Sequence, residues 1–292
     1  MPPSAGAAGV GVQELLRVAG RRLRDAGILN GDWDAELLLR HVTGWERARL
    51  VAAHDEALSE DARRRFEELL RERERRRPLQ HLTGTQAFWR HEFRVTPDVL
   101  IPRPDTEILV EAALDALRGR RAPLVVDVGT GSGCIALSLA HERPDARVIA
   151  VDISPAALAV ARDNALRLGL AGRVAFHEGD LLQPLRPRWG ELDVVASNPP
   201  YIDPAAPDLE PEVFEHEPHA ALFGREHAYS AYEDLVPQAV GALRPGGRLL
   251  LEVGHGMAAR VVALCLAAGC ELVDVRRDLR GIERVVHAAR PG

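Results

Sequence analysis

A glycine-rich loop follows a short apolar segment near the middle of the chain. The apolar segment is residues 124–128, and a helical pattern begins at Ile135. Glycine lets the backbone turn sharply and lets a ligand approach the main chain closely. The pattern indicates a cofactor loop between a strand and a helix, and a purely structural turn is the alternative. The loop residues are Gly129, Thr130, Gly131, Ser132 and Gly133.

The details of this loop separate two classes of cofactor. A dinucleotide fingerprint, G-x-G-x-x-G, would need its third glycine at position 134, where this chain has Cys134. Asp127 stands just before the loop, at the end of the expected strand. This form resembles the first motif of class I S-adenosylmethionine-dependent methyltransferases. We therefore expect Asp127 and the loop to bind S-adenosylmethionine rather than a dinucleotide.

Two further acidic residues follow the next expected strands. Asp152 ends the segment 147–151, and a carboxylate there can accept both ribose hydroxyls of a nucleoside. Asp180 and Leu181 come after the segment 174–176. Asp180 can accept from the adenine amino group while Leu181 packs on the ring, although a turn or helix cap is the alternative. Asp152 would serve either cofactor class and does not discriminate between them.

The most specific motif directly follows the fourth expected strand, and its residues are Asn198, Pro199, Pro200 and Tyr201. Open α/β sheets bind ligands at the carboxyl ends of their strands, so this motif is well placed for catalysis. An amide nitrogen is a poor nucleophile because its lone pair is delocalised. The Asn198 side-chain oxygen and the Pro199 carbonyl can accept both N–H groups and so orient that lone pair toward a sulfonium methyl.

The rest of this motif suits the same chemistry. Neither proline offers a competing N–H, and Tyr201 supplies a flat wall. No strong base is needed, since the proton becomes acidic only after methylation. Orientation then supplies most of the rate gain, through effective molarities of roughly 10⁵–10⁸ M. A proline-rich turn is the structural alternative.

The motifs require a sheet that brings strand ends together. Apolar segments alternate with helical patterns throughout residues 101–292, which predicts an α/β fold with an open, mostly parallel, Rossmann-like sheet. Two short closing segments at 270–275 and 283–287 predict an antiparallel final hairpin. Helical patterns fill residues 11–77, with Ser59 as an N-cap. We expect a helical docking domain at 1–78, a β-hairpin linker at 79–100 and a methyltransferase domain at 101–292.

Composition excludes several function classes. All 37 basic residues are Arg, so neither a Schiff base nor a Walker-type lysine is available. Residues 1–100 carry 17 Arg against 16 acidic residues, whereas 101–292 carry 20 Arg against 27. The acidic larger part disfavours a nucleic-acid partner. No apolar run reaches the roughly 18–20 residues of a membrane span. Three cysteines without ligand spacing indicate a reduced, cytoplasmic protein and no metal site.

A longer block makes a family resemblance clear. Residues 100–107 read L-I-P-R-P-D-T-E, and His81-Leu82-Thr83-Gly84 precedes Phe88-Trp89. Together with the glycine loop and N-P-P-Y, these residues resemble the release factor glutamine methyltransferase family (PrmC/HemK) over nearly the whole chain. The resemblance implies N5-methylation of the glutamine in the Gly-Gly-Gln loop of class I peptide chain release factors. It also implies that Asn198 contacts the donor and that residues 198–201 hold the glutamine amide.

Several alternatives stay open on the sequence. A nucleic-acid amino methyltransferase of the adenine-N6 type would use the same N-P-P-Y motif, and a non-catalytic or NAD-binding protein would not need it. The acidic segment 202–224 is either a solvated loop or a lid that meets the release factor. The run 71–77 is a solvated helix face or a docking surface, which makes 63–77 the first surface to test. Phe88 and Trp89 serve linker packing or the site. We expect a monomer, since no heptad run demands a dimer.

Overall fold

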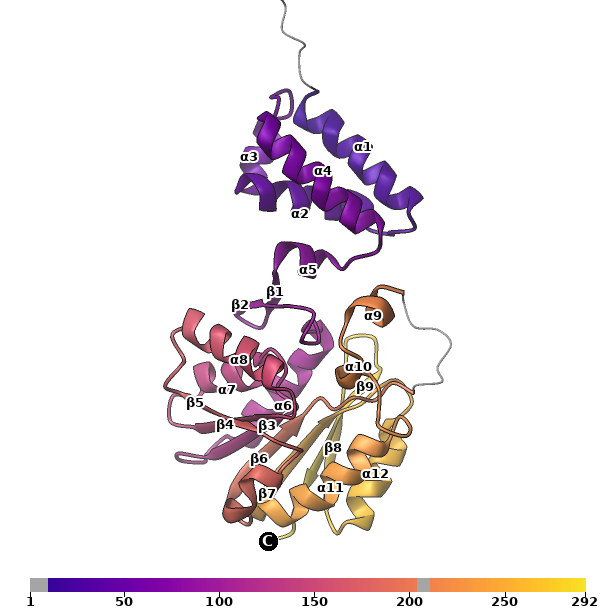
Figure 1. Ribbon diagram of the computed structural model, residues 1–292. Helices are drawn as coiled ribbons and strands as arrows, with labels where there is room; N and C mark the ends of the chain where they lie inside the picture. The colour runs from indigo at the N-terminus through magenta and orange to yellow at the C-terminus, as the bar shows by residue number, and fades with distance from the viewer. Residues whose placement is uncertain (1–9, 204–210) are drawn as a thin grey trace, which may run out of the picture. The chain divides into compact units, whose positions relative to one another are not determined.

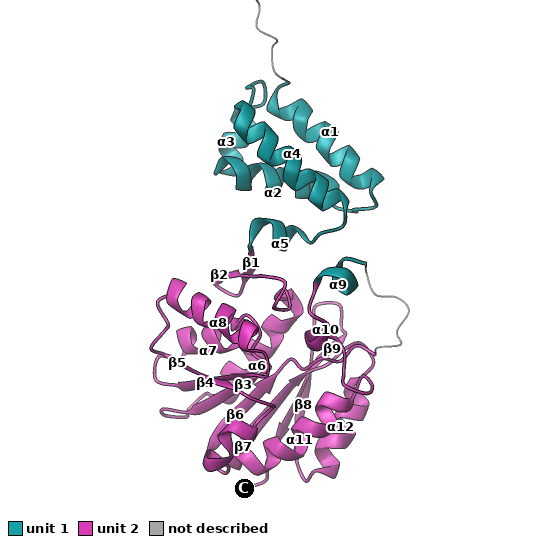
Figure 2. Ribbon diagram, viewed as in Figure 1, with its two compact units in different colours: residues 1–84, 210–216 teal, residues 85–209, 217–292 magenta. Residues whose placement is uncertain are grey.

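The computed structural model describes residues 10–203 and 211–292 (Figure 1). The chain divides into two compact units (Figure 2). One unit comprises the described residues up to Gly84 together with helix α9 (Pro211–His216), and the other comprises the remaining described residues. Within the two described ranges, no helix is both long enough and apolar enough to cross a bilayer.

The first unit is a small helical bundle. Its apolar centre includes Leu23, Leu38 and Phe66, each fully buried. Ser59 accepts a hydrogen bond from the Ala62 amide at 3.2 Å, which confirms the predicted N-cap. The unit divides from the next after Gly84, because the short helix at 79–83 packs on the bundle. Its helices are α1 (Val12–Asp25), α2 (Gly31–Thr43), α3 (Arg47–Ala52), α4 (Glu60–Glu74), α5 (Leu79–Thr83) and α9.

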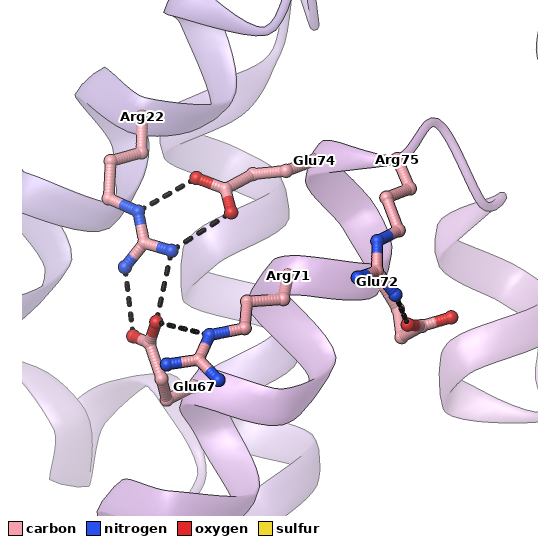
Figure 3. A network of polar contacts seen from close by, with 6 residues as sticks. All are labelled: Arg22, Glu67, Arg71, Glu72, Glu74 and Arg75. Atoms are coloured by element: carbon pink, nitrogen blue, oxygen red, sulfur yellow. Dashed lines mark hydrogen bonds and ion pairs between the residues drawn. The ribbon is translucent and has the colours of Figure 1, made fainter.

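The arginine-rich helix α4 is largely ion-paired within its own unit. Figure 3 shows Arg22 of α1 held between two α4 carboxylates, Glu67 and Glu74, at 2.8 and 2.7 Å. The predicted Glu67–Arg71 pair is present at 3.1 Å. Arg73 is buried, at 5% exposure, and donates to the Asp34 carboxylate at 2.7 Å. The hypothesis of a wholly solvated face is therefore wrong for Arg73. This residue is buried because its guanidinium pairs with two carboxylates from distant parts of the chain, Asp34 and Glu212.

One of those two carboxylates comes from the acidic segment after the N-P-P-Y motif. Glu212 of α9 lies 3.2 Å from both Arg73 and Arg76. A plain solvated loop is therefore the wrong description for this residue. Asp208 and Glu210 of the same acidic segment lie outside the described residues.

A β-hairpin opens the second unit. Strands β1 (Thr85–Phe88) and β2 (His91–Arg94) pair antiparallel, which confirms the predicted hairpin. Phe88 is buried and meets Phe93 edge to face, with ring centroids 6.0 Å apart. Trp89 donates its backbone N–H to Glu107 and its ring N–H to Glu142. Both aromatics therefore pack the hairpin onto this unit.

The described residues of this unit form a seven-stranded sheet in the order β5-β4-β3-β6-β7-β9-β8. β9 runs antiparallel to both its neighbours and the other pairs are parallel, which confirms the predicted open α/β sheet and its antiparallel final strand. The strands are β3 (Leu124–Val128), β4 (Arg147–Asp152), β5 (Val174–Glu178), β6 (Leu192–Ser197), β7 (Leu243–Glu252), β8 (Glu271–Arg277) and β9 (Glu283–Ala289).

Helices cover both faces of this sheet (Figure 1). Alternation along the strands directs side chains to two cores: Val126 and Val128 face one, and Val125 faces the other. α11 and α12 contribute to the first core, and α6, α7 and α8 to the second. The helices are α6 (Glu107–Ala116), α7 (Cys134–Glu142), α8 (Pro155–Arg167), α10 (His219–Leu222), α11 (Ser230–Ala242) and α12 (Ala258–Ala267), with 3₁₀ turns η1 (Pro104–Thr106) and η2 (Gln183–Arg188).

The register of the parallel strands places their carboxyl ends side by side. Val128 at the end of β3 lies opposite Val151 of β4 and Ser197 of β6, and Ser197 lies opposite Leu251 of β7. The residues that follow these strands therefore meet at one edge of the sheet. This edge carries the glycine loop, Asp152 and the N-P-P-Y motif, as expected for ligand binding in open α/β sheets.

Candidate active site

Asp127 fixes the glycine loop through hydrogen bonds on its buried side. It is fully buried, and its Oδ2 accepts from the Thr130 hydroxyl at 2.6 Å and from the Ala136 amide at 3.1 Å. It thereby ties the loop to the first turn of α7. Burial raises the pKa of Asp127 to about 7, against the lowering effect of these two hydrogen bonds. Its Oδ1 has no hydrogen-bond partner in the described part of the chain.

The loop presents open main chain on one side. Gly129 and Gly131 both have positive φ, and a Cβ added at either would meet no atom within 4 Å. Gly133 differs, because its Cβ would lie 3.1 Å from Leu137 and 3.2 Å from Ala161. Its glycine therefore allows close helix packing. Ser132 is buried, and its hydroxyl has no partner among residues 10–203 and 211–292. Open main chain beside an unpartnered hydroxyl fits a polar ligand such as the amino-acid part of a nucleoside donor.

Asp152 holds the same loop from the end of β4. One carboxylate oxygen accepts from the Gly131 amide at 2.8 Å, and the other accepts from the Ser154 amide at 2.9 Å. Burial raises the pKa of Asp152, and these backbone hydrogen bonds oppose the rise. Each carboxylate oxygen has a second lone pair, so both can also accept a ligand hydroxyl. The position agrees with a ribose contact and adds a structural task that the sequence did not indicate.

Asp180 and Leu181 follow β5 at the same edge. Asp180 is half-exposed and forms an ion pair with Arg225, with 2.5 Å between Oδ1 and the Nη2 nitrogen. Leu181 adopts a φ of 50° and packs against the core on the α11 side. A left-handed conformation is uncommon for leucine, so the chain holds this residue in place. Arg225 is a neighbour that the sequence reasoning missed.

The N-P-P-Y residues leave the end of β6. Asn198 is partly buried and its Nδ2 donates to the Thr106 hydroxyl oxygen at 3.2 Å. In this orientation the nitrogen end of the amide faces Thr106, which leaves Oδ1 to accept from a ligand. Pro199 is buried, while Pro200 and Tyr201 are partly buried. Tyr201 packs beside Gly254, where an added Cβ would lie 3.0 Å from the ring.

The block 101–107 frames this motif through contacts that reach far along the chain. Glu217, buried at 4% exposure, accepts from the Ile101 amide at 3.1 Å and pairs with Arg103. Asp105 pairs with Arg284 of β9 at 2.8 Å. Thr106, within η1, supplies the hydroxyl that meets Asn198. The block therefore anchors one side of the site, and solvated loop is again the wrong description for Glu217.

A buried carboxyl lies behind the same motif and was missed by sequence reasoning. Glu252 ends β7 and is 2% exposed. Burial raises the pKa of Glu252 to about 7, and the nearby Thr106 and Tyr201 side chains oppose that rise. The signal in the sequence was a single acidic residue at the end of an apolar strand, without a recognisable motif. In the described ranges, no group of three or more His, Cys, Asp or Glu side chains is arranged to hold a metal ion.

Comparisons with known proteins match both parts of the chain. The family model described as the PrmC N-terminal domain matches residues 14–84, and that of the methyltransferase small domain matches residues 104–220. The release factor glutamine methyltransferase of Moorella thermoacetica is 46% identical over 280 residues, which cover 96% of this chain and 98% of that protein. The protein of the same name from Burkholderia pseudomallei is 45% identical over 89% of this chain and 92% of its own length.

One solved structure resembles the chain over a shorter range. The protein-(glutamine-N5) methyltransferase (release factor-specific) of Alicyclobacillus acidocaldarius is 35% identical and covers 68% of this chain and 100% of its own, with a TM-score of 0.43.

Proposed function

This chain belongs to the release factor glutamine methyltransferase family, and on that premise we propose how its sheet edge performs methyl transfer. It is an enzyme that methylates the side-chain amide nitrogen (N5) of a glutamine in a release factor. We propose S-adenosylmethionine as the donor and the Gly-Gly-Gln loop of class I release factors as the acceptor. The donor supplies an electrophilic sulfonium methyl when bound.

The donor is proposed to lie along the glycine loop and the strand ends beside it. The open main chain at Gly129 and Gly131 supports a close approach of its amino-acid part. Asp152 accepts from the ribose hydroxyls. Asp180 accepts from the adenine amine once its ion pair with Arg225 has opened. Leu181 offers an apolar wall to the adenine. Asp127 acts beneath the loop, where its contacts with Thr130 and Ala136 keep the loop shaped.

The glutamine amide is proposed to bind at the N-P-P-Y residues. The observation that carries this proposal is the Asn198–Thr106 hydrogen bond, because it leaves Asn198 Oδ1 as an acceptor for one substrate N–H. The Pro199 carbonyl accepts the other N–H, and Tyr201 walls the amide plane. The N5 lone pair then points at the methyl carbon. Transfer would form the N5–C bond and break the S–C bond of the donor, leaving the donor as a neutral thioether, and the proton on N5 would then pass to water.

The partner is proposed to be a protein loop rather than nucleic acid. A Gly-Gly-Gln loop presents one amide on flexible backbone, which suits a site built from acceptors. The acidic balance of residues 101–292 would repel phosphate. The helical unit is proposed to dock the release factor, with the exposed arginines of 63–77 as the first surface to test. We also propose that the enzyme works as a cytoplasmic monomer and needs no metal.

The decisive experiment compares three acceptors. The protein is incubated with methyl-labelled donor and, separately, with a class I release factor, DNA and RNA. We expect label in the release factor alone, with one added methyl on the loop glutamine by mass spectrometry. A release factor whose loop glutamine is replaced by alanine is the matched control and should take no label. Label found only in nucleic acid would overturn the proposed substrate.

A further inference from the structure

Arg284 is a charged residue of β9 that the proposed chemistry does not yet use. Its guanidinium lies between two carboxylates, with Nε 2.9 Å from Asp278 and Nη2 2.8 Å from Asp105. The Arg284 side chain is 18% exposed and that of Asp278 is 8% exposed. Withdrawing such charges from water is costly unless they are paired in a defined geometry. The place of this guanidinium beside the block 101–107 therefore needs an explanation.

The turn between β8 and β9 fixes the direction of the Arg284 guanidinium. Asp278 Oδ1 accepts from the backbone amides of Arg280 and Ile282, both at 2.9 Å, and its Oδ2 accepts from Arg284 Nε. A guanidinium is planar and its N–H groups form a rigid fork, so a fixed Nε also determines where Nη2 points. The final hairpin therefore presents the Nη2 donor to Asp105 from a defined direction.

Asp105 connects this guanidinium to the N-P-P-Y motif. Asp105 and Thr106 are consecutive residues of η1, within which the Thr106 amide donates to the Arg103 carbonyl at 3.1 Å. Thr106 is buried, and its hydroxyl oxygen accepts from Asn198 Nδ2 at 3.2 Å. A displacement of Asp105 would therefore move the hydroxyl against which the Asn198 amide is oriented.

We propose that Arg284 is a positioning residue for methyl transfer, which acts through Asp105 and Thr106 to keep the Asn198 oxygen turned toward the substrate amide. Arg284 itself touches no substrate. The inference gives the antiparallel strand β9 a task at the site, since β9 carries the guanidinium that holds η1. It rests on the proposed function, because it requires Asn198 as the acceptor for the glutamine amide.

The main chain of Arg284 also supports the Tyr201 part of the motif. Its carbonyl accepts from the Val253 amide at 2.8 Å, which continues the pairing of β7 with β9 by one more residue. The next residue, Gly254, is the one whose added Cβ would lie 3.0 Å from the Tyr201 ring. A substitution of the Arg284 side chain leaves this backbone contact in place. Such a substitution therefore tests the path through Asp105 alone.

Two substitutions cut the path at its first ion pair. Arg284→Met removes the guanidinium but keeps a long unbranched side chain, and Asp105→Asn keeps the shape but removes the charge. We expect kcat to fall about 10-fold in each, less than the roughly 10²-fold that a 1 Å misplacement at a reaction site costs. Donor affinity by calorimetry should equal that of wild type in both. The Asp105 side chain is 45% exposed, so Asp105→Asn should fold even if Arg284→Met does not.

Arg277→Met is the matched control on the same hairpin. Arg277 of β8 pairs with Glu283 at 2.5 Å and donates to the Gly281 carbonyl at 2.8 Å. Its loss therefore removes an arginine and an ion pair from this hairpin but leaves the contact with Asp105 intact. We expect kcat and donor affinity to equal those of wild type.

A double variant separates positioning from a structural role. Thr106→Val cuts the same path at its last step, because valine lacks the hydroxyl that meets Asn198. In the Thr106→Val background, Arg284→Met should lower kcat by less than about 2-fold further, because two changes to one connected path are not additive. A residue with only a structural role would lower kcat by the same factor in both backgrounds.

The outcomes separate this inference from the proposed function. If wild type fails to methylate a release factor, the proposed function fails. If wild type methylates it but Arg284→Met and Asp105→Asn keep the wild-type kcat, the positioning role is wrong. The role is also wrong if Arg277→Met loses as much activity as Arg284→Met, or if the losses of Arg284→Met and Thr106→Val multiply. Thermal unfolding of every variant identifies any loss that comes from misfolding. If Arg284→Met does not fold, Asp105→Asn alone and combined with Thr106→Val decides the question.

Discussion

The two units bury charge in opposite ways. In the helical unit, the buried guanidinium of Arg73 meets the carboxylates of Asp34 and Glu212. At the sheet edge, Asp127 and Glu252 are fully buried without a salt bridge in the described residues, and each keeps one oxygen without a hydrogen-bond partner there. Paired charge holds a fold together, whereas unpaired carboxyls at strand ends are available for loop shape, polarity and ligands. The following predictions test that contrast.

The largest effect is expected where a buried pair is broken. Arg73→Met leaves Asp34 buried without its partner, and we expect a loss of about 3–5 kcal/mol in the free energy of unfolding. Chemical denaturation of the full chain measures it. Arg75→Met is the matched control, because Arg75 is exposed and pairs with Glu72 on the surface, and it should change stability by less than about 1 kcal/mol. If the two substitutions lowered stability equally, the buried ion pair of Arg73 would contribute no more to stability than the exposed pair of Arg75.

The next effect falls on catalysis rather than stability. Asn198→Ala removes the proposed amide acceptor, and we expect kcat to fall about 10²–10³-fold, as when one oriented hydrogen-bonding group is lost from a reaction site. Unfolding should occur near the wild-type temperature, because Asn198 is only partly buried. Methyl transfer to the release factor and thermal unfolding are measured together. Wild-type turnover by this variant would contradict the role given to Asn198.

Donor affinity provides a third test. Asp152→Ala removes the proposed ribose acceptor and its hydrogen bonds from the Gly131 and Ser154 amides. Donor binding by calorimetry should weaken about 10- to 100-fold, since hydrogen bonds to a charged group contribute about 1.5–3 kcal/mol. Asp145→Ala removes an exposed carboxylate just before the amino end of β4, the end away from the site, and should bind the donor like wild type. Unchanged affinity in Asp152→Ala would remove the ribose contact from the proposal.

The unpaired carboxyl of Asp127 should appear as a pH dependence of stability. Its folded pKa, about 7, lies above its ordinary value, so its contribution to stability is full below about pH 4 and lost as the pH rises through about 7. Asp127→Asn cannot ionise. As the pH rises from 5 to 8, wild type should therefore lose stability relative to the variant. The difference between their free energies of unfolding should change by on the order of 1 kcal/mol or more in favour of the variant. Chemical denaturation at several pH values measures this difference. If the free energies of unfolding of wild type and variant change with pH in parallel, the raised pKa of Asp127 does not affect stability.

The smallest effect concerns the exposed pair of Asp180 and Arg225. Arg225→Ala frees the proposed adenine acceptor, so donor affinity should rise, but by less than about 5-fold, because exposed ion pairs contribute about 0–1 kcal/mol. Arg225 also approaches Asp234 at 3.7 Å. Asp234→Ala, as a control, should leave donor affinity unchanged. Weaker donor binding in Arg225→Ala would indicate that the arginine belongs to the donor site.

The sequence predicted the parts of the fold that depend on local pattern. Alternating apolar segments and helices indicated the parallel sheet, and Ser59 and the hairpin were correct because capping and turn preferences act over a few residues. The site motifs could be found for the same reason, since the glycine loop and N-P-P-Y each follow a strand directly. Parallel register then brings their strand ends together.

What the sequence could not provide are contacts between distant positions. Glu217 and Ile101 are 116 residues apart, and Thr106 and Asn198 are 92 residues apart. Arg73 read as part of a solvated run because its partner Asp34 lies 39 residues earlier. Such pairs depend on how elements pack, and a charged residue in a single sequence does not reveal whether its partner is water or another side chain. Glu252 escaped notice for this reason.

The path of the chain around α9 limits how the protein can be divided. The chain leaves the sheet unit after the N-P-P-Y motif, adds α9 to the helical unit, and returns to the sheet unit at Glu217. A shortened protein that starts at Thr85 would keep α9 but lose Arg73 and Arg76, and Glu212 would face solvent alone. A single protease cut near residue 84 would leave residues 1–84 attached to the rest of the chain only through non-covalent contacts of α9, such as the ion pairs of Glu212 with Arg73 and Arg76. Deleting the helical unit cleanly therefore also requires replacing 211–216 with a neutral linker.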